Sequence, residues 1–142
     1  GIHTGDGQAA MEELRIIQSK GISANAWIWI HAQKEQNREL HILAANAGGW
    51  VSFDGVHADS ISSCLDFLKD MKKENLLDHV LLSHDAGWYH VGEANGGNYS
   101  DYNTIADKLI PSLKENGFTE KEIRLLFFTN PSIAFAIKIR KK

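Results

Sequence analysis

The stretch Ala26-Trp27-Ile28-Trp29-Ile30 decides the fold, because an unbroken apolar run rich in aromatic and β-branched residues is typical of a strand buried on both faces. Three other stretches share this character. Trp50-Val51-Ser52-Phe53 follows the turn signal Gly48-Gly49, His79-Val80-Leu81-Leu82-Ser83 comes later, and Gly1-Ile2-His3 stands at the start. We therefore predict four strands that begin near residues 1, 26, 49 and 79.

Amphipathic segments fill the gaps between these strands. Residues 60–73 place their apolar side chains on one helical face: Ile61, Cys64, Leu65, Leu68 and Met71. Similar patterns predict helices over residues 8–19, 36–46 and 101–116, with a kink at Pro111, and short helices that begin at Thr119 and Pro131. Because strands and helices alternate, we expect an α/β fold of about four βα units with a parallel sheet.

Composition excludes several classes of protein. The 142 residues are 43% hydrophobic and 23% charged, and the formal net charge of −3 argues against a nucleic-acid partner. No apolar run is long enough for a membrane span, so we expect no membrane partner. A single cysteine, Cys64, cannot form an internal disulfide, which favours a reducing compartment and a cytoplasmic location.

Polar side chains that can bind metals follow each predicted strand. His3 ends the first, His31 follows the second, Asp54 follows the third and Asp85 follows the fourth. The carboxyl ends of parallel strands carry the active sites of such folds. Histidine and aspartate are common ligands of zinc and similar divalent ions. The recurrence across four units therefore favours a metal site over four incidental surface residues.

These residues resemble a known family in their order and spacing. His3-Thr4 at a strand end, His31 after the second strand, Leu82-Ser83-His84-Asp85 and Thr129-Asn130-Pro131 together resemble the C-terminal half of a phosphotriesterase-family barrel, within the amidohydrolase superfamily. The resemblance covers essentially the whole chain. It implies that residues 1–142 are a single partial domain, containing strands five to eight and the following helices of a (β/α)8 barrel.

The resemblance also implies a chemistry. Family members bind two divalent metals, usually zinc, and hydrolyse ester, lactone or phosphoester bonds through a metal-bound hydroxide. By position, His3 and His31 resemble the two histidine ligands of the more exposed metal. Asp85 resembles the aspartate of the last strand, which binds the more buried metal and is catalytic because it accepts the proton of the hydroxide.

The chain departs from the family pattern at several places. Nothing in it matches the family's His-x-His pair on the first strand or the carboxylated lysine on the fourth. Lys34 stands where the organophosphate-degrading members have an aspartate, and about Gly55 stands in place of their seventh-strand histidine. The proton relay of the triester specialists is therefore absent. Relatives with Ser-His-Asp before the last loop, as in Ser83-His84-Asp85, are often lactonase-like, so the resemblance favours ester or lactone substrates.

Other residues are candidates for binding a small-molecule substrate. Asp54 either contacts the substrate or caps the loop that follows it. The glycine-rich segment 86–100 contains Trp88, Tyr89 and His90, which we expect to line a substrate pocket as part of a lid, the alternative being a surface loop with incidental aromatics. Strand alternation directs His84 away from the metal centre.

The resemblance to half a barrel carries an expectation about partners. A half-barrel leaves two unpaired strand edges and an open apolar face, so we expect the chain to associate with a missing N-terminal half or with itself. By itself it should be catalytically inactive. The alternatives are a half-barrel without catalysis and a small α/β binding domain with incidental histidines.

Overall fold

A computed structural model describes residues 1–139. Its described residues form one sheet of four parallel strands in the order β1-β2-β3-β4. The strands span β1 Ile2–His3, β2 Ile28–Ile30, β3 Trp50–Phe53 and β4 Val80–Leu82. The α/β class with parallel strands, predicted from the apolar runs, is therefore confirmed.

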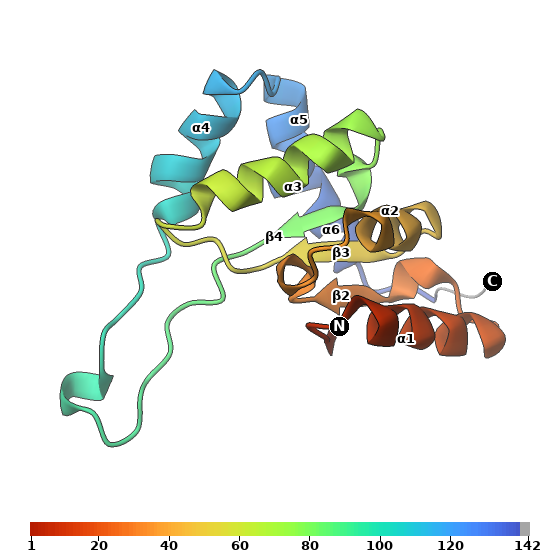
Figure 1. The fold of residues 1–142 in the computed structure, drawn as a ribbon, viewed down its shortest axis with the longest axis horizontal. Coiled ribbons are helices and arrows are strands. Elements are labelled where there is room, and N and C mark those ends of the chain that lie inside the picture. The colour runs from red at the N-terminus through yellow and green to blue at the C-terminus, as the bar shows by residue number, and fades with distance from the viewer. Residues whose placement is uncertain (140–142) are drawn as a thin grey trace.

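Helices connect the strands, and the longer ones pack against one face of the sheet (Figure 1). Three of them, α1 Gly7–Ser19, α2 Arg38–Asn46 and α3 Ile61–Lys73, lie in the gaps between successive strands. The shorter α4 Ile110–Glu115, α5 Glu120–Arg124 and α6 Asn130–Ala134 follow β4. Single turns of 3-10 helix occupy η1 Ala24–Ala26, η2 Ala32–Lys34, η3 Leu77–His79 and η4 Ala94–Gly96.

The main hydrophobic core lies between the sheet and α1 to α3. Trp29, Val51 and Val80 are fully buried there, together with Leu68 and Met71 from α3. Trp27 stacks on Trp29 with ring centroids 6.3 Å apart, so both tryptophans belong to the core, as their shared strand face predicts. This packing holds in place the sheet whose strands end in the candidate site residues.

A smaller cluster covers the opposite face of the sheet. Trp50 and Leu81 pack there against Ala134 of α6, with Ile28 beside them. A cavity on this face is lined by hydrophobic residues and by two carboxylates, including Ile30, Leu81, Phe135, Asp54 and Asp85. The carboxylates therefore stand at the edge of an apolar depression.

Several predicted boundaries shift in the structure. The apolar run 26–30 forms a strand only from Ile28, because Ala24–Ala26 make a 3-10 turn before it. The helix predicted from residue 36 begins at Arg38, since the Asn37 side chain accepts the amide of Glu39 and caps it. Thr119 and Glu122 form the capping box that their spacing predicts.

The two prolines each follow a widened helical segment. Residues η5 Ile105–Leu109 and η6 Leu125–Thr129 are π-helical, and Pro111 and Pro131 stand in the first turn of the α-helices that follow them. A proline lacks the N–H that would continue the α-helical hydrogen-bond ladder. At the predicted kink near Pro111, the helix changes from the π-helical form of residues 105–109 to the α-helical form of residues 110–115.

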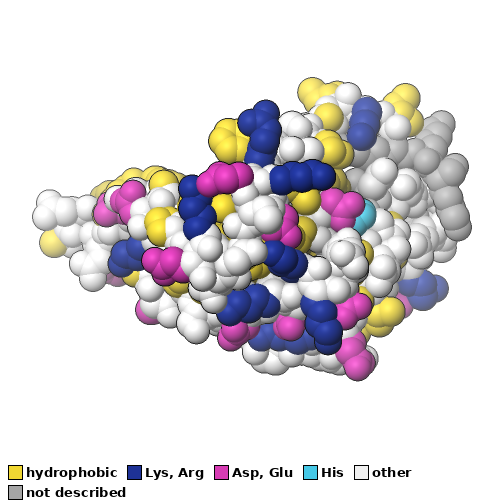
Figure 2. All heavy atoms as spheres, turned by 90° about the horizontal axis from the view of Figure 1, so that it is seen from above, with side chains coloured by type: hydrophobic (Ala, Val, Ile, Leu, Met, Phe, Trp, Pro, Cys, Tyr) yellow, Lys and Arg dark blue, Asp and Glu magenta, His cyan; other side chains and the backbone are white. Residues whose placement is uncertain are grey.

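Acidic and basic side chains are interspersed on the face seen in Figure 2. Arg38 lies near Asp70, Lys72 pairs with Glu122 at 2.9 Å and Lys114 pairs with Glu120 at 2.7 Å. Among residues 1–139, no helix combines the length and apolar character needed to cross a membrane.

Candidate metal centre

The site lies where the parallel strands end. His3 is the last residue of β1 and pairs in register with Ile30, so His31 follows one step further along β2. Nδ1 of His3 lies 3.0 Å from Nε2 of His31, and the two rings meet edge to face. Two residues that are 28 positions apart in the sequence are thus brought side by side by strand pairing.

Asp54 is the buried member of the site. Its carboxylate accepts two hydrogen bonds from His31, from the backbone N–H to Oδ2 at 2.8 Å and from ring Nδ1 to Oδ1 at 2.7 Å. Gln33 donates from Nε2 to Oδ1 at 2.9 Å, and its own Oε1 accepts the amide of Asp54 at 3.2 Å. With 4% of its surface exposed, Asp54 has protein donors around it rather than water.

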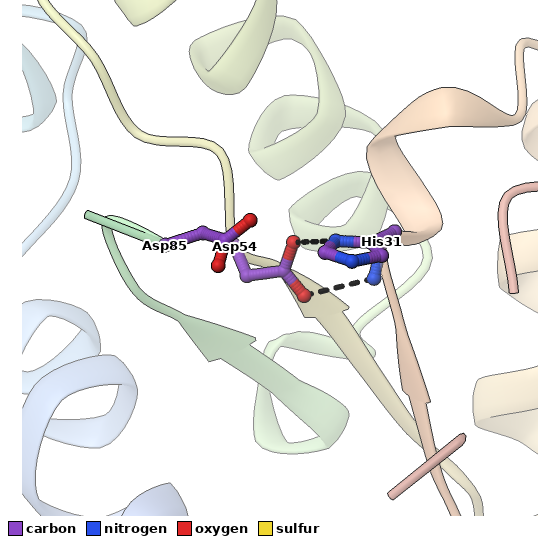
Figure 3. Close-up of side chains that lie close together, drawn as sticks. All are labelled: His31, Asp54 and Asp85. Carbon is purple, nitrogen blue, oxygen red and sulfur yellow. Dashed lines mark hydrogen bonds and ion pairs between the residues drawn. The ribbon is translucent and has the colours of Figure 1, made fainter. Parts of the chain in front are cut away.

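Asp85 reaches this cluster from the far side. One ligand atom from each of His31, Asp54 and Asp85 lies within 4.8 Å of the other two. Figure 3 shows the Asp85 side chain extending from the end of β4 toward Asp54, while the Asp54 carboxylate turns toward His31. Unlike Asp54, Asp85 is exposed.

The backbone at two of these positions is strained. His31 has φ 68° and Asp85 has φ 47°, in the left-handed region that few residues other than glycine adopt. Such conformations cost of order 1–3 kcal/mol each and cluster at functional sites. Both side chains are thereby turned out of the strand direction at the carboxyl edge of the sheet.

A hydrogen-bond network behind β1 holds the His3 end of the site. The Trp29 indole donates to the carbonyl of Thr4 at 2.6 Å, and the Thr4 hydroxyl donates to the Glu13 carboxylate. The Trp27 indole donates to the same carboxylate at 3.1 Å. The residue after His3 is therefore tied to both core tryptophans.

The segment after β4 extends away from the sheet as a long loop, toward the lower left of Figure 1. The Trp88 indole donates to the carbonyl of Asp85 at 2.9 Å, which keeps its ring beside the site, although the ring is largely exposed. Tyr89 packs over Gly96, and the His90 amide donates to the carbonyl of Gly96 at 2.8 Å. Tyr89 and His90 thus contact their own loop.

Two further residues, His84 and Cys64, have structural rather than chemical roles. Nε2 of His84 accepts the amide N–H of Ile105 at 3.1 Å, and burial together with the nearby His57 lowers the pKa of His84. The neutral ring is the form that can accept this bond. Burial raises the pKa of the Cys64 thiol to about 12, so this cysteine is not a nucleophile at neutral pH.

The donor set fits a divalent metal. Because Nδ1 of His31 is engaged by Asp54, the Nε2 lone pair is left to face His3. At a separation of 3.0 Å, Nδ1 of His3 and Nε2 of His31 are close enough that both could bind one ion. Two imidazoles with a nearby exposed carboxylate are the ligand types that zinc and similar ions take.

The sequence gives no sign of Gln33 and Glu13 as members of the site. Gln33 touches Asp54 only because β2 and β3 pair in register, with Trp29 beside Val51. Glu13 lies on α1 and reaches Thr4 across the top of β1. Neither residue is next to a predicted strand end, so no local pattern could have identified them.

Comparisons with known proteins agree on a family. A sequence model described as the phosphotriesterase family matches residues 1–135. The phosphotriesterase homology protein of Escherichia coli (strain K12) is 26% identical over 136 residues, which cover 94% of this chain and 46% of that protein. The chain therefore spans less than half the length of this relative.

Solved structures share the fold. The resiniferatoxin-binding protein of Rhodobacter sphaeroides superposes with a TM-score of 0.78 at 20% identity, over 99% of this chain and 42% of that one. The organophosphorus hydrolase of Deinococcus radiodurans gives 0.76 at 20% identity, over 88% and 42%. The structure of the Escherichia coli protein, with phosphate in its active site, gives 0.76 at 24% identity, over 92% and 45%. The expected correspondence to half of a (β/α)8 barrel is confirmed.

Proposed function

Because the chain belongs to the phosphotriesterase family, we propose that it supplies the C-terminal half of a metal-dependent hydrolase barrel. One observation carries the proposal: side chains from four successive βα units converge at the carboxyl edge of the sheet. His3 touches His31, and His31, Asp54 and Asp85 form one compact group. This is the edge at which barrel enzymes carry their chemistry.

The side chains have separate roles in this proposal. His3 and His31 would hold one divalent ion, and Asp85 would hold a second; zinc is the expected metal. When bound, such ions lower the pKa of water and polarise a carbonyl or phosphoryl oxygen. Asp85, the exposed carboxylate, accepts the proton released when the water becomes a nucleophile.

We propose an ester, lactone or phosphoester as substrate, with ester and lactone favoured. Lys34 and Gly55 offer no carboxylate or imidazole at the two positions where the organophosphate-degrading members have an aspartate and a histidine, so the proton relay of those members is not expected here. Trp88 borders Asp85 through its indole and provides apolar area for the body of the substrate. Tyr89 and His90 shape the loop that carries Trp88.

The open side of the sheet supports a requirement for a partner. In the described part of the chain, β1 and β4 each have a strand neighbour on one side only. The apolar depression beside Asp54 and Asp85 is the face that the first half of a barrel would cover. We therefore propose that the isolated chain associates with that half, or with a second copy, and has negligible turnover.

The experiment compares the chain with a full-length gene product that contains it. Bound zinc is measured by mass spectrometry after dialysis, and hydrolysis is assayed on an aryl ester, a lactone and a phosphotriester. We expect the longer protein to retain zinc and to turn over with a kcat of roughly 10 s⁻¹. The isolated chain should oligomerise or aggregate in sedimentation and show no turnover above the solvent rate.

Matched histidine variants of the longer protein identify the site. His31→Ala should remove both zinc and activity. His79→Ala should preserve both, because His79 stands before β4 at the other end of the strand and contacts the carbonyl of Gly49. A longer protein without zinc, or equal behaviour of the two variants, would refute the hydrolase. A monomeric chain with metal-dependent turnover would refute the requirement for a partner.

A further inference from the structure

We propose that Asp54 is a positioning residue rather than a ligand or a substrate contact, and that Gln33 holds it in place. Asp54 fixes the ring of His31 with the proton on Nδ1, so that Nε2 is directed at the metal position. This inference rests on the proposed metal centre. It also assigns Gln33, which no sequence pattern singles out, to the site.

The geometry of Asp54 points to this role. Oδ1 accepts from ring Nδ1 of His31 and from Nε2 of Gln33, and Oδ2 accepts from the His31 backbone amide. Both carboxylate oxygens are thus engaged by protein donors at 2.7–2.9 Å. In Figure 3 the carboxylate faces His31 and turns away from Asp85. Three of the roughly four acceptor sites of the carboxylate are thus used within the protein, which favours a positioning role over metal binding.

The contact with His31 fixes the tautomer. A carboxylate oxygen accepts hydrogen bonds, so the proton of the neutral His31 ring lies on Nδ1. The unprotonated Nε2 then faces Nδ1 of His3 at 3.0 Å. Histidines that bind metals generally donate their second ring N–H to a carboxylate or carbonyl in this way, which fixes ring orientation and raises ligand basicity.

The same carboxylate also supports the strained backbone of His31. In the left-handed conformation the amide of His31 points toward Asp54, and Oδ2 accepts it at 2.8 Å. One side chain therefore satisfies both the ring and the backbone of the ligand. Loss of either bond removes part of the interaction that offsets the strain.

Gln33 restrains Asp54 through a reciprocal pair of bonds. Its amide nitrogen donates to Oδ1 and its amide oxygen accepts the backbone N–H of Asp54, at 2.9 and 3.2 Å. Gln33 belongs to the single 3-10 turn that follows His31. The Asp54–Gln33 pair thus links the ends of β2 and β3 beyond the last backbone bonds of the sheet.

The test reads the tautomer of His31 directly in the longer protein, after its metal has been removed with a chelator. Long-range ¹H–¹⁵N correlation spectra distinguish Nδ1–H from Nε2–H in each ring. We expect His31 of the natural chain to be the Nδ1–H tautomer. Asp54→Ala should lose this preference, and Gln33→Ala should weaken it. Asp85→Ala is the matched control, because the carboxylate that His31 bonds to is that of Asp54 and the loss of Asp85 should leave the tautomer unchanged.

A second readout is zinc affinity, measured by competition with a chromophoric chelator. Removal of the carboxylate partner of a metal-bound histidine typically costs 10–100-fold in affinity, which is the loss expected for Asp54→Ala. Asp54→Asn keeps the side-chain size and one acceptor oxygen, so it should fold as the natural chain does and lose affinity partially. Backbone amide spectra verify the fold of each variant.

The outcomes separate this inference from the proposed function. An Nδ1–H tautomer that depends on Asp54, in a chain and a longer protein that bind no zinc, would refute the metal centre and leave the positioning role standing. An Nε2–H tautomer in the natural chain, or one unaffected by Asp54→Ala in a folded variant, would refute the positioning role. Zinc binding unchanged by Asp54→Ala would refute it as well.

Discussion

Trp29→Phe should loosen β1, and His3 with it, more than any other part of the sheet. The Trp29 side chain is fully buried, and its indole N–H is bonded to the carbonyl of Thr4 at 2.6 Å. Phenylalanine keeps the aromatic packing but cannot donate. β1 contains two residues, so this bond is a large part of what attaches it to β2.

The size of the effect follows from the contacts. Removing the donor of a buried hydrogen bond leaves the Thr4 carbonyl unsatisfied, which costs about 1–3 kcal/mol. We expect local opening at β1 to become easier by about 2 kcal/mol, which corresponds to roughly 30-fold faster exchange of the protected amide. That amide is Thr4 N–H, which donates to the carbonyl of Ile30 at 3.0 Å.

The assay is amide hydrogen exchange on the longer protein that contains the chain, followed residue by residue. Trp50→Phe is the matched control, because Trp50 is also buried and its indole donates to the carbonyl of Asn25 at 3.2 Å, on β3 rather than at β1. It should leave the exchange of Thr4 unchanged. Equal acceleration of Thr4 in both variants would refute the argument, since the effect would then be a general loss of stability.

Three further results are expected. Trp88→Ala in the longer protein should change the ratio of kcat/KM between two esters without changing bound zinc; lost zinc with an unchanged ratio would contradict the role given to Trp88. Cys64 should react with a disulfide reagent at pH 7.5 only as fast as the chain unfolds, because burial raises the pKa of its thiol to about 12; rapid reaction in the native state would contradict this. Burial lowers the pKa of His41 in the folded chain below the usual 6.5, so the unfolded state binds more protons than the folded state at acidic pH. The free energy of unfolding should therefore fall as the pH drops below about 6.5. In urea titrations, His41→Gln should show a shallower fall than the natural chain.

Much of the fold could be predicted from local patterns. The apolar runs identify the strands because a parallel strand is buried on both faces, and the stripe of Leu65, Leu68 and Met71 identifies α3. Boundaries moved by a residue or two where a cap such as Asn37 set the start. The π-helical segments before Pro111 and Pro131 have no pattern of their own in the sequence.

The site was only partly accessible to the same reasoning. Strand ends indicated His3, His31, Asp54 and Asp85 because parallel strands end at one edge. Their metal-binding and catalytic roles remain predictions. The bonds among them depend on register and on backbone conformation, such as the left-handed turn at His31, which periodicity does not reveal. The contact between Asp54 and His31 therefore had to come from the structure.

The members of the site are held to different degrees, and this bears on how the centre assembles. His31 is bonded to Asp54 by ring and backbone, and His3 is carried by a strand whose next residue is tied to Trp29 and Glu13.

Asp85 has a weaker attachment. It is exposed and stands in a left-handed turn beyond β4, where its carbonyl accepts the Trp88 indole from a largely exposed loop. In the proposed metal centre the histidine side is thus organised without a metal, whereas the carboxylate side depends on the loop. Since ordering an exposed side chain costs conformational entropy, Asp85 is the ligand whose position a bound metal and a covering partner would change most.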